Sequence, residues 1–202
     1  MTSERALDAD QQAVVDALRA AISSSGLTQR DFARAIGTSP SRMSAYLHGD
    51  TAPSAPLLMK CQRIGNALCA AREENIPSPL DCAASLRCSL ETAQRASGVL
   101  RFALEARDRL RDTLENRPHL ADAWDAKATI GEKRWDTLFA ALVEHEFTTA
   151  GRPAPSWAHV EPLEEEWIPA KGRQSEDEIR ETTPSWLADK GILLAESALA
   201  VA

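Results

Sequence analysis

The sequence predicts a mainly α-helical protein in which short helices follow one another closely. Apolar residues recur every three or four positions, and capping residues or glycines stand at the ends of these stretches. The 202 residues fit one domain or two small ones, since a domain typically has roughly 100–200 residues. Hydrophobic residues make up 44% and charged residues 26% of the chain, which is near the globular average and argues against wholesale disorder.

The first predicted helix covers residues 9–24, where an apolar stripe recurs at helical spacing and Gly26 ends the helix. A second helix of two turns begins after Thr28, which opens a capping box, and it closes at Gly37. Both helices need a partner, because each presents one apolar side.

A third short helix is predicted over residues 40–47. Ser39 supplies the N-cap, and Pro40 stands at the first helical position, where its missing N–H costs nothing. Gly49 stops this helix, and a fourth begins near Ser54. The third helix buries one side, which leaves the other for solvent or a ligand.

Two further helical regions are predicted in the second half. Residues 80–116 form one or two long helices that stop at Asn116-Arg117-Pro118, and residues 132–150 form another helix that ends at Gly151. The apolar side of residues 80–116 is either ordinary core or a dimer seam.

Regular structure thins between Gly151 and Pro184, where prolines are frequent. A short acidic helix is expected at residues 175–182, and a final helix or turn begins at Thr183-Pro184. This part of the chain is therefore predicted to be a Pro/Trp-rich irregular segment.

Charge and tryptophan content divide the chain into two regions. Residues 26–72 carry a net charge of +4, whereas residues 127–202 carry -6, so the total of -7 averages two unlike parts. All five tryptophans lie beyond residue 120. We place the boundary near Ile76-Pro77-Ser78-Pro79, where two prolines forbid a continuous helix, and so predict domains at residues 1–76 and 77–202, the second acidic and Trp-rich from residue 127.

The stretch from Leu27 to Gly49 carries a functional signature. Two short helices joined by a tight turn at Gly37 form a helix-turn-helix, with Ala33 as the small residue that lets them approach and Met43 as a buried anchor. This stretch resembles the Xre/Cro repressor family. The resemblance implies a lambda-repressor-like helical domain over about residues 9–72 that binds double-stranded DNA.

The outward side of the third predicted helix is the candidate for base contacts. Its side chains are short apart from Arg42, so the helix can lie close to the major groove. Arg42 can reach a guanine or a phosphate, and Gln29 resembles the glutamine with which the family contacts phosphate. The alternative for each residue is a solvated helix surface. The candidate DNA-binding residues are Gln29, Arg30, Ser39, Pro40, Ser41, Arg42, Ser44, Ala45 and Lys60.

A single module with a charge of +4 is expected to bind DNA weakly, because each neutralised phosphate contributes modestly at cellular salt. Members of the family usually bind as dimers to inverted repeats. We therefore expect a homodimer on an inverted-repeat operator.

The second half carries another resemblance. Its patterns are Arg134–Phe147, Pro-Ala-Pro-Ser-Trp157, Pro162–Trp167 and Thr183–Leu187, and they look like the C-terminal region of actinobacterial Xre-type antitoxins. The resemblance implies a toxin–antitoxin gene pair in which the partner is a nucleotidyltransferase-like toxin.

The tryptophans of the proline-rich stretch have two interpretations. They either pack an irregular but ordered segment, or they anchor a partner, as tryptophan often does at interfaces. The candidate partner-binding residues are Trp157, Glu164, Glu165, Glu166, Trp167 and Trp186.

Other function classes find little support. The four cysteines form no CxxC pair, so we expect buried thiols and no metal site or cofactor. No apolar run approaches the roughly 18 residues of a membrane span. The N-terminus has acids where a signal peptide needs basic then apolar residues, so a cytoplasmic protein is expected, nucleoid-associated when bound to DNA.

The sequence thus predicts an antitoxin and transcriptional autorepressor without enzymatic activity. One alternative is a stand-alone Xre-family regulator whose second half dimerises or senses a ligand. Another is an enzyme fused to the DNA-binding module, since Glu144, His145 and Glu146 adjoin on one helix. Neighbouring helix positions point about 100° apart, however, so these three do not converge unaided.

Overall fold

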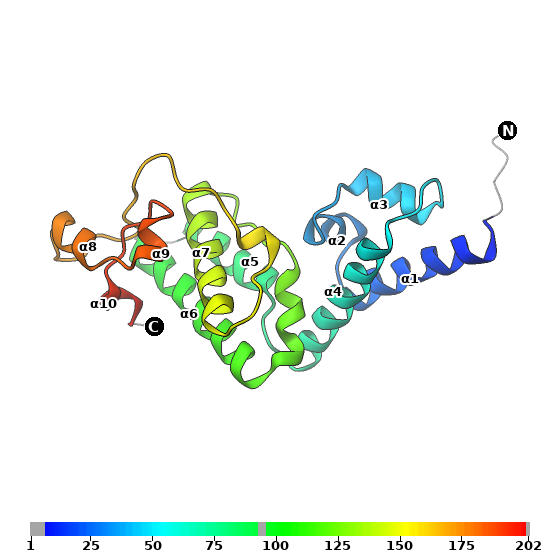
Figure 1. The fold of residues 1–202 in the computed structure, drawn as a ribbon, viewed down its shortest axis with the longest axis horizontal. Helices are drawn as coiled ribbons and strands as arrows, with labels where there is room; N and C mark the ends of the chain where they lie inside the picture. The colour runs from blue at the N-terminus through cyan, green and yellow to red at the C-terminus, as the bar shows by residue number, and fades with distance from the viewer. Residues whose placement is uncertain (1–6, 93–95, 201–202) are drawn as a thin grey trace. The chain divides into compact units, whose positions relative to one another are not determined.

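The computed structural model describes residues 7–92 and 96–200, which fall into two compact units. The first unit consists of Met1–Ser78 with His119–Lys127, and the second of Pro79–Pro118 with Ala128–Ala202 (Figure 1). The chain therefore passes from one unit to the other three times.

The first unit contains the four helices that the sequence predicts. Each begins directly after a polar side chain that accepts a hydrogen bond from the first turn: Asp8, Thr28, Ser39 and Ser54. The helices are α1 (Ala9–Ser25), α2 (Gln29–Ala35), α3 (Pro40–Leu47) and α4 (Ala55–Glu73).

Helices α1 and α4 pack closely because Gly65 presents no side chain to α1. A methyl group placed on Gly65 would lie 2.5 Å from the carbonyl oxygen of Ala21. Leu18 of α1 and Ile64 of α4 are both fully buried, as is Phe32 of α2. These residues form part of the core of the first unit.

A segment that follows the second unit's long helices completes the first unit. It forms the 3-10 helix η1 (Pro118–Asp125), which buries Leu120 and Trp124. Arg63 of α4 forms ion pairs with Asp122, at 2.9 Å, and with Asp125. The domain boundary predicted near residue 76 assigned this segment to the second half. It joins the first unit because its apolar side chains are buried there.

The second unit is also helical among the described residues. The apolar region 80–116 divides into two helices, and its leucines at positions 86, 104 and 110 are buried within the chain, which favours the core interpretation. None of the described helices is long and apolar enough to cross a membrane. The elements are α5 (Pro79–Thr92), α6 (Ala96–Asn116), α7 (Lys133–Thr149), η2 (Ser156–Ala158), α8 (Glu176–Thr182), α9 (Ser185–Ala188) and α10 (Glu196–Leu199).

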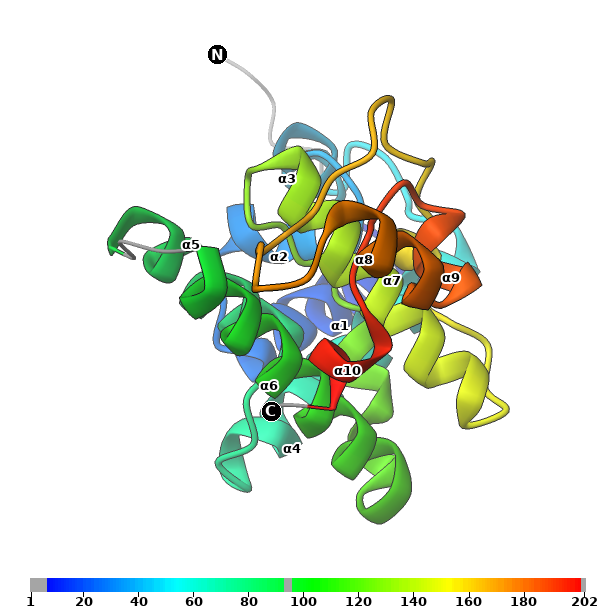
Figure 2. The ribbon, with the colours of Figure 1, turned by 90° about the vertical axis from the view of Figure 1, so that its left-hand side faces the viewer.

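The proline-rich segment is irregular but ordered, and its backbone is bonded to the end of the chain. The Trp167 N–H donates to the Gly191 carbonyl at 2.9 Å, and the Leu193 N–H donates to the Trp167 carbonyl at 2.8 Å. Trp167 and Ile192 form an isolated parallel β-bridge. Helices η2 and α9 both contact α7, which lies at the centre of this unit (Figure 2).

The cysteines divide by burial. Cys61 and Cys82 are buried, and burial raises the pKa of each thiol to about 11. Cys69 of α4 is half-buried and Cys88 of α5 is exposed, so the expectation of buried thiols is wrong for Cys88 and met only in part by Cys69. The two buried thiols behave as small apolar side chains.

Candidate nucleic-acid interface

The turn between α2 and α3 depends on Gly37. This glycine adopts a φ of 82°, in the left-handed region that side-chain-bearing residues avoid. The Thr38 N–H then donates to the Ala33 carbonyl at 2.9 Å, which closes the end of α2. The Ser39 hydroxyl accepts from the Arg42 N–H at 3.2 Å and opens α3. Two helices are thus joined within four residues.

One side of α3 holds the helix to the protein. Met43, the predicted buried anchor, is fully buried, and Tyr46 and Leu47 are nearly so. Ala33 of α2 is also fully buried, consistent with its predicted role as the small residue between the two helices. The position of α3 is therefore fixed by packing.

The other side of α3 carries the residues predicted to contact bases. Ser41 and Arg42 are exposed, and Ser44 and Ala45 are half-buried. Among the described residues, the Arg42 guanidinium has no hydrogen-bond or ion-pair partner. Its donors are free for a guanine edge or a phosphate, while its short neighbours allow the helix to approach a groove.

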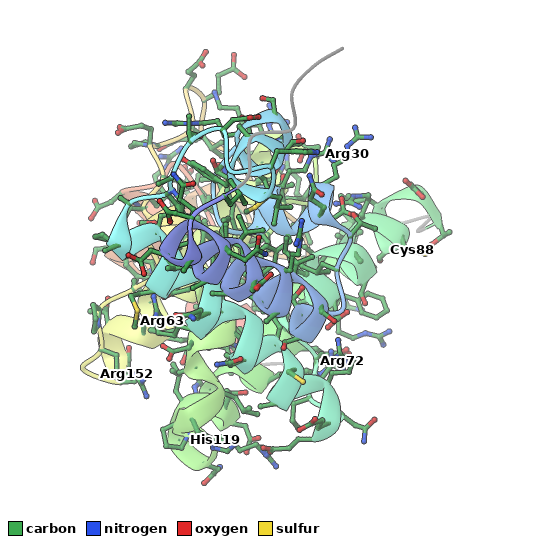
Figure 3. The ribbon with its side chains drawn as sticks, turned by 90° about the vertical axis from the view of Figure 1, so that its right-hand side faces the viewer. Arg30, Arg63, Arg72, Cys88, His119 and Arg152 are labelled. Atoms are coloured by element: carbon green, nitrogen blue, oxygen red, sulfur yellow. The ribbon has the colours of Figure 1, made fainter. Side chains whose placement is uncertain are left out.

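The start of α2 presents two more of the predicted residues. Gln29 and Arg30 are both exposed, and Arg30 projects outward from the unit (Figure 3). The Thr28 hydroxyl donates to the Asp31 carboxylate at 2.7 Å and accepts from the Asp31 N–H. The Asp31 carboxylate is therefore hydrogen-bonded to the N-cap residue of α2. Arg30 has no partner within the described part of the chain, which leaves its charge available.

Three of the predicted residues have structural roles. The Lys60 ammonium donates to the Ile36 carbonyl at 3.1 Å, so it stabilises the C-terminal end of α2. Ser39 caps α3 and lies 3.0 Å from the Ser41 hydroxyl, and Pro40 opens the same helix. DNA contact by these residues stays a prediction.

Two further residues near this surface, His48 and Lys127, are not among those predicted from the sequence. His48 is exposed at the end of α3, and its ring Nδ1 lies 2.7 Å from the Ser44 carbonyl oxygen. Its position directly after the third helix could have identified it. Lys127 is exposed and its N–H donates to the Ala35 carbonyl at 2.6 Å, a contact with no signal in the local sequence.

Most other described arginines and lysines of the first unit form ion pairs or hydrogen bonds within the protein. Arg63 pairs with two aspartates of η1, and this pairing raises the pKa of its guanidinium in spite of partial burial. Arg72, labelled in Figure 3, donates to the Ser24 carbonyl at 3.0 Å. Arg34 pairs with Asp31 at 3.6 Å. Over residues 7–78 and 119–127, the unpaired arginines and lysines therefore lie on and around α2 and α3.

The three tryptophans predicted as partner anchors each contact α7. Trp157 stacks on Phe139 with ring centroids 5.8 Å apart, and Trp167 meets Trp135 edge-on at 4.9 Å. Trp186 stacks on His145 at 4.0 Å. All three are half-buried, and their ring contacts attach η2, the proline-rich segment and α9 to α7.

The three glutamates beside Trp167 form an exposed acidic stretch. Glu164 pairs with Lys133 at 2.9 Å and Glu165 with Arg134 at 3.7 Å, yet their side chains stay 87% and 84% exposed. Glu166 pairs with Arg180 at 2.6 Å. Surface pairs of this kind contribute little to stability and can exchange partners.

The side chains of Glu144, His145 and Glu146 contact three different groups. Glu144 lies 2.7 Å from the His159 ring and 3.2 Å from the Lys190 ammonium, His145 stacks on Trp186, and Glu146 accepts from Arg111. They do not converge on a common point. Within residues 7–92 and 96–200, no group of three or more His, Cys, Asp or Glu side chains is placed to hold a metal ion.

Comparison with known proteins identifies the module. Residues 18–65 match a family model described as helix-turn-helix, which covers α2, α3, the C-terminal part of α1 and the N-terminal part of α4. This segment is an Xre-type helix-turn-helix domain, the DNA-binding module of a class of transcription regulators. Neither the curated proteins nor the solved structures contain a match to the chain.

Proposed function

We propose that this protein is a sequence-specific DNA-binding repressor that acts as a homodimer on an inverted-repeat operator. The observation that carries the proposal is the outward side of α3, where an unpaired Arg42 stands among short side chains on a helix fixed by buried residues. Arg42 contacts a base edge, with Ser41, Ser44 and Ala45 beside it in the major groove. Gln29 and Arg30 contact the DNA backbone and set the register.

Dimerisation follows from the small charge of the module. One protomer offers few free cations, and affinity from phosphate neutralisation grows with the number of contacts. Two protomers on an inverted repeat double the contacts and read twice the sequence.

DNA binding is tested by a gel shift with the fragment upstream of the protein's own reading frame. We expect two protomers per operator and loss of binding when the symmetry of the operator is disrupted. Binding of one protomer to a single half-site, without symmetry, would contradict the proposed dimer.

We further propose a more specific role, in which the repressor is an antitoxin and its second unit binds a toxin. The supporting observations are the charge of -6 over residues 127–202 and the exposed Glu164 and Glu165 beside the half-buried Trp167. An acidic surface of this kind fits a basic partner. The toxin is expected to be encoded beside this protein and to be nucleotidyltransferase-like.

Co-purification with the products of the adjacent genes tests the antitoxin role. We expect one neighbour to bind the full chain and to lose its growth-inhibiting activity when bound. Glu164→Lys and Glu165→Lys together should weaken that complex, whereas Glu91→Lys on α5 with Glu115→Lys on α6 should not. Failure of every neighbouring product to bind would refute this role.

A second candidate function is a stand-alone regulator whose second unit senses a small ligand. A cavity of about 340 Å³ supports it, lined by Glu144, His145, Trp186 and Lys190 among others. This candidate is favoured if the gene stands alone and DNA affinity changes with a metabolite.

A further inference from the structure

The segment that joins the first unit from the second half ends at Lys127, close to the helix-turn-helix. Its main-chain N–H donates to the carbonyl of Ala35, the last residue of α2, at 2.6 Å. Four residues later, Ser39 caps α3. The backbone of Lys127 is thus attached at the point where the chain turns into the predicted DNA-contacting helix.

Several contacts hold this segment to the first unit. Trp124 is 2% exposed, and Arg63 pairs with Asp122 and Asp125. At the start of the segment, the His119 ring lies 2.6 Å from the Glu74 carboxylate. The Lys127 backbone is therefore fixed by burial and ion pairing as well as by its own hydrogen bond.

The side chain of Lys127 has no such restraint. It is exposed, and its ammonium has no hydrogen-bond or ion-pair partner among residues 7–92 and 96–200. Lys60, by contrast, uses its ammonium on the Ile36 carbonyl at the same end of α2. Of these two lysines, only Lys127 offers an unoccupied charge.

From these contacts we infer that Lys127 contacts a DNA phosphate when α3 occupies the major groove. The inference rests on the proposed DNA binding. Phosphates line both edges of the groove, which is about 12 Å wide, so a long cationic side chain attached beside the start of α3 is well placed to reach one. The DNA-binding surface then extends beyond residues 18–65 and includes a residue from the segment that follows α6.

A phosphate contact has a specific signature in the dependence of DNA affinity on salt. Each neutralised phosphate adds about -0.9 to the slope of log K against log salt concentration. Lys127→Gln should make the slope shallower by about 0.9 per bound protomer, so the loss of affinity between 50 and 200 mM salt becomes roughly three- to fourfold smaller for each protomer, or about twelvefold smaller for the proposed dimer. Folding should be unaffected, because the bond to Ala35 uses the main chain.

The experiment measures binding of the full chain to its upstream DNA over that salt range. Lys171→Gln is the matched control, since it removes the same charge from a lysine of the second unit that pairs with Glu176. We expect the control to retain the wild-type slope and Lys127→Gln to change it. Lys127→Arg should restore the wild-type slope.

Two results would overturn the inference. If the wild-type chain binds DNA and both glutamine variants show the same slope, Lys127 makes no phosphate contact although the proposed function stands. If the wild-type chain does not bind the DNA at all, the proposed function fails and this inference fails with it.

Discussion

The two units of this protein differ in which of their charged side chains lack a partner. In the first unit, the described cations without a partner include Arg30, Arg42 and Lys127, which lie on or beside α2 and α3. In the second unit, most described arginines and lysines pair with carboxylates or donate to carbonyls, and exposed carboxylates such as Glu161 and Glu181 remain free of partners among the described residues.

This difference explains why the total charge of -7 does not argue against DNA binding. A cation whose donors are used inside the protein contributes little to phosphate recognition, whereas an unpaired one beside a recognition helix contributes directly. The location and pairing of each charge decide which partner a surface can bind, and the net charge does not.

The largest effect is expected at Glu146, the one buried carboxylate among the described residues, which forms an ion pair with an arginine. Glu146 is 3% exposed and accepts two hydrogen bonds from Arg111, at 2.8 and 3.0 Å. Arg111→Met leaves this carboxylate buried without its partner. We expect a loss of about 2–3 kcal/mol in unfolding free energy, less than for a fully buried pair because Arg111 is half exposed.

Urea unfolding of the second unit, followed by tryptophan fluorescence, measures this loss. The double variant Arg111→Met with Glu146→Gln should recover much of it, because no buried charge is then left unpaired. In the first unit, Arg63→Met should cost about 1 kcal/mol or less, since both of its pairs are substantially exposed. Equal losses of unfolding free energy for Arg111→Met and Arg63→Met would contradict the expectation that the ion pair with the buried carboxylate stabilises the fold more than the exposed pairs.

The second effect concerns DNA affinity. Arg42→Ala should weaken binding to the operator by about 1–3 kcal/mol per protomer, the usual cost of losing a specific arginine contact. Arg173→Ala removes an exposed arginine of the second unit that also has no partner within the described residues. We expect fluorescence anisotropy to show no change in affinity for Arg173→Ala. Equal weakening by both variants would mean that only total charge matters.

The third effect compares one glycine from each unit. Gly65→Ala should destabilise the first unit by about 1–2 kcal/mol, because the added methyl group meets the Ala21 carbonyl across the contact of α1 and α4. Gly98 of α6 has open space around it, so Gly98→Ala should be neutral or stabilise by up to about 1 kcal/mol through helix propensity. Thermal unfolding monitored by circular dichroism distinguishes these outcomes. A loss of stability in Gly98→Ala would contradict the open space around Gly98.

The smallest effect is the dependence of the second unit's stability on acid. Burial tends to raise the pKa of Glu144, but hydrogen bonds from His159 and Lys190 outweigh it and hold the pKa below the ordinary 4.5. A carboxyl whose pKa is lower in the folded state stabilises the fold above its unfolded-state pKa, and this contribution is lost as the pH falls through the folded-state value. Unfolding free energy should therefore decrease as the pH falls below about 4.5.

Glu144→Gln should remove part of that decrease, while Glu161→Gln, at an exposed glutamate without a partner in the described chain, should retain it. Tryptophan emission is a suitable probe, since Trp135, Trp157, Trp167 and Trp186 all belong to the second unit. Identical acid profiles for the two variants would show that the Glu144 contacts do not stabilise the fold.

Local chemistry made much of the first unit predictable. The caps Thr28, Ser39 and Ser54 and the stop at Gly37 are local signals, so the helices they delimit follow from the sequence. The spacing of apolar residues predicts which side of α3 is buried, and the remaining positions are then predicted to face outward.

The parts that could not be predicted depend on contacts between distant residues. The 3-10 helix η1 lacks the 3.6-residue period by which helices are recognised, and its packing depends on Arg63, 59 residues from Asp122. The bond from Lys60 to Ile36 and that from Lys127 to Ala35 are likewise visible only once the chain is folded. The tryptophans of the second half were recognised, but the partners onto which they pack were not.

The most direct test of the central claim is hydrogen–deuterium exchange on the full chain with and without its upstream double-stranded DNA. If the first unit reads DNA through α3, DNA should slow exchange in peptides covering residues 28–48 and leave residues 132–200 unchanged. Slower exchange confined to residues 132–200, or none in residues 28–48 under conditions where the complex forms, would contradict the claim.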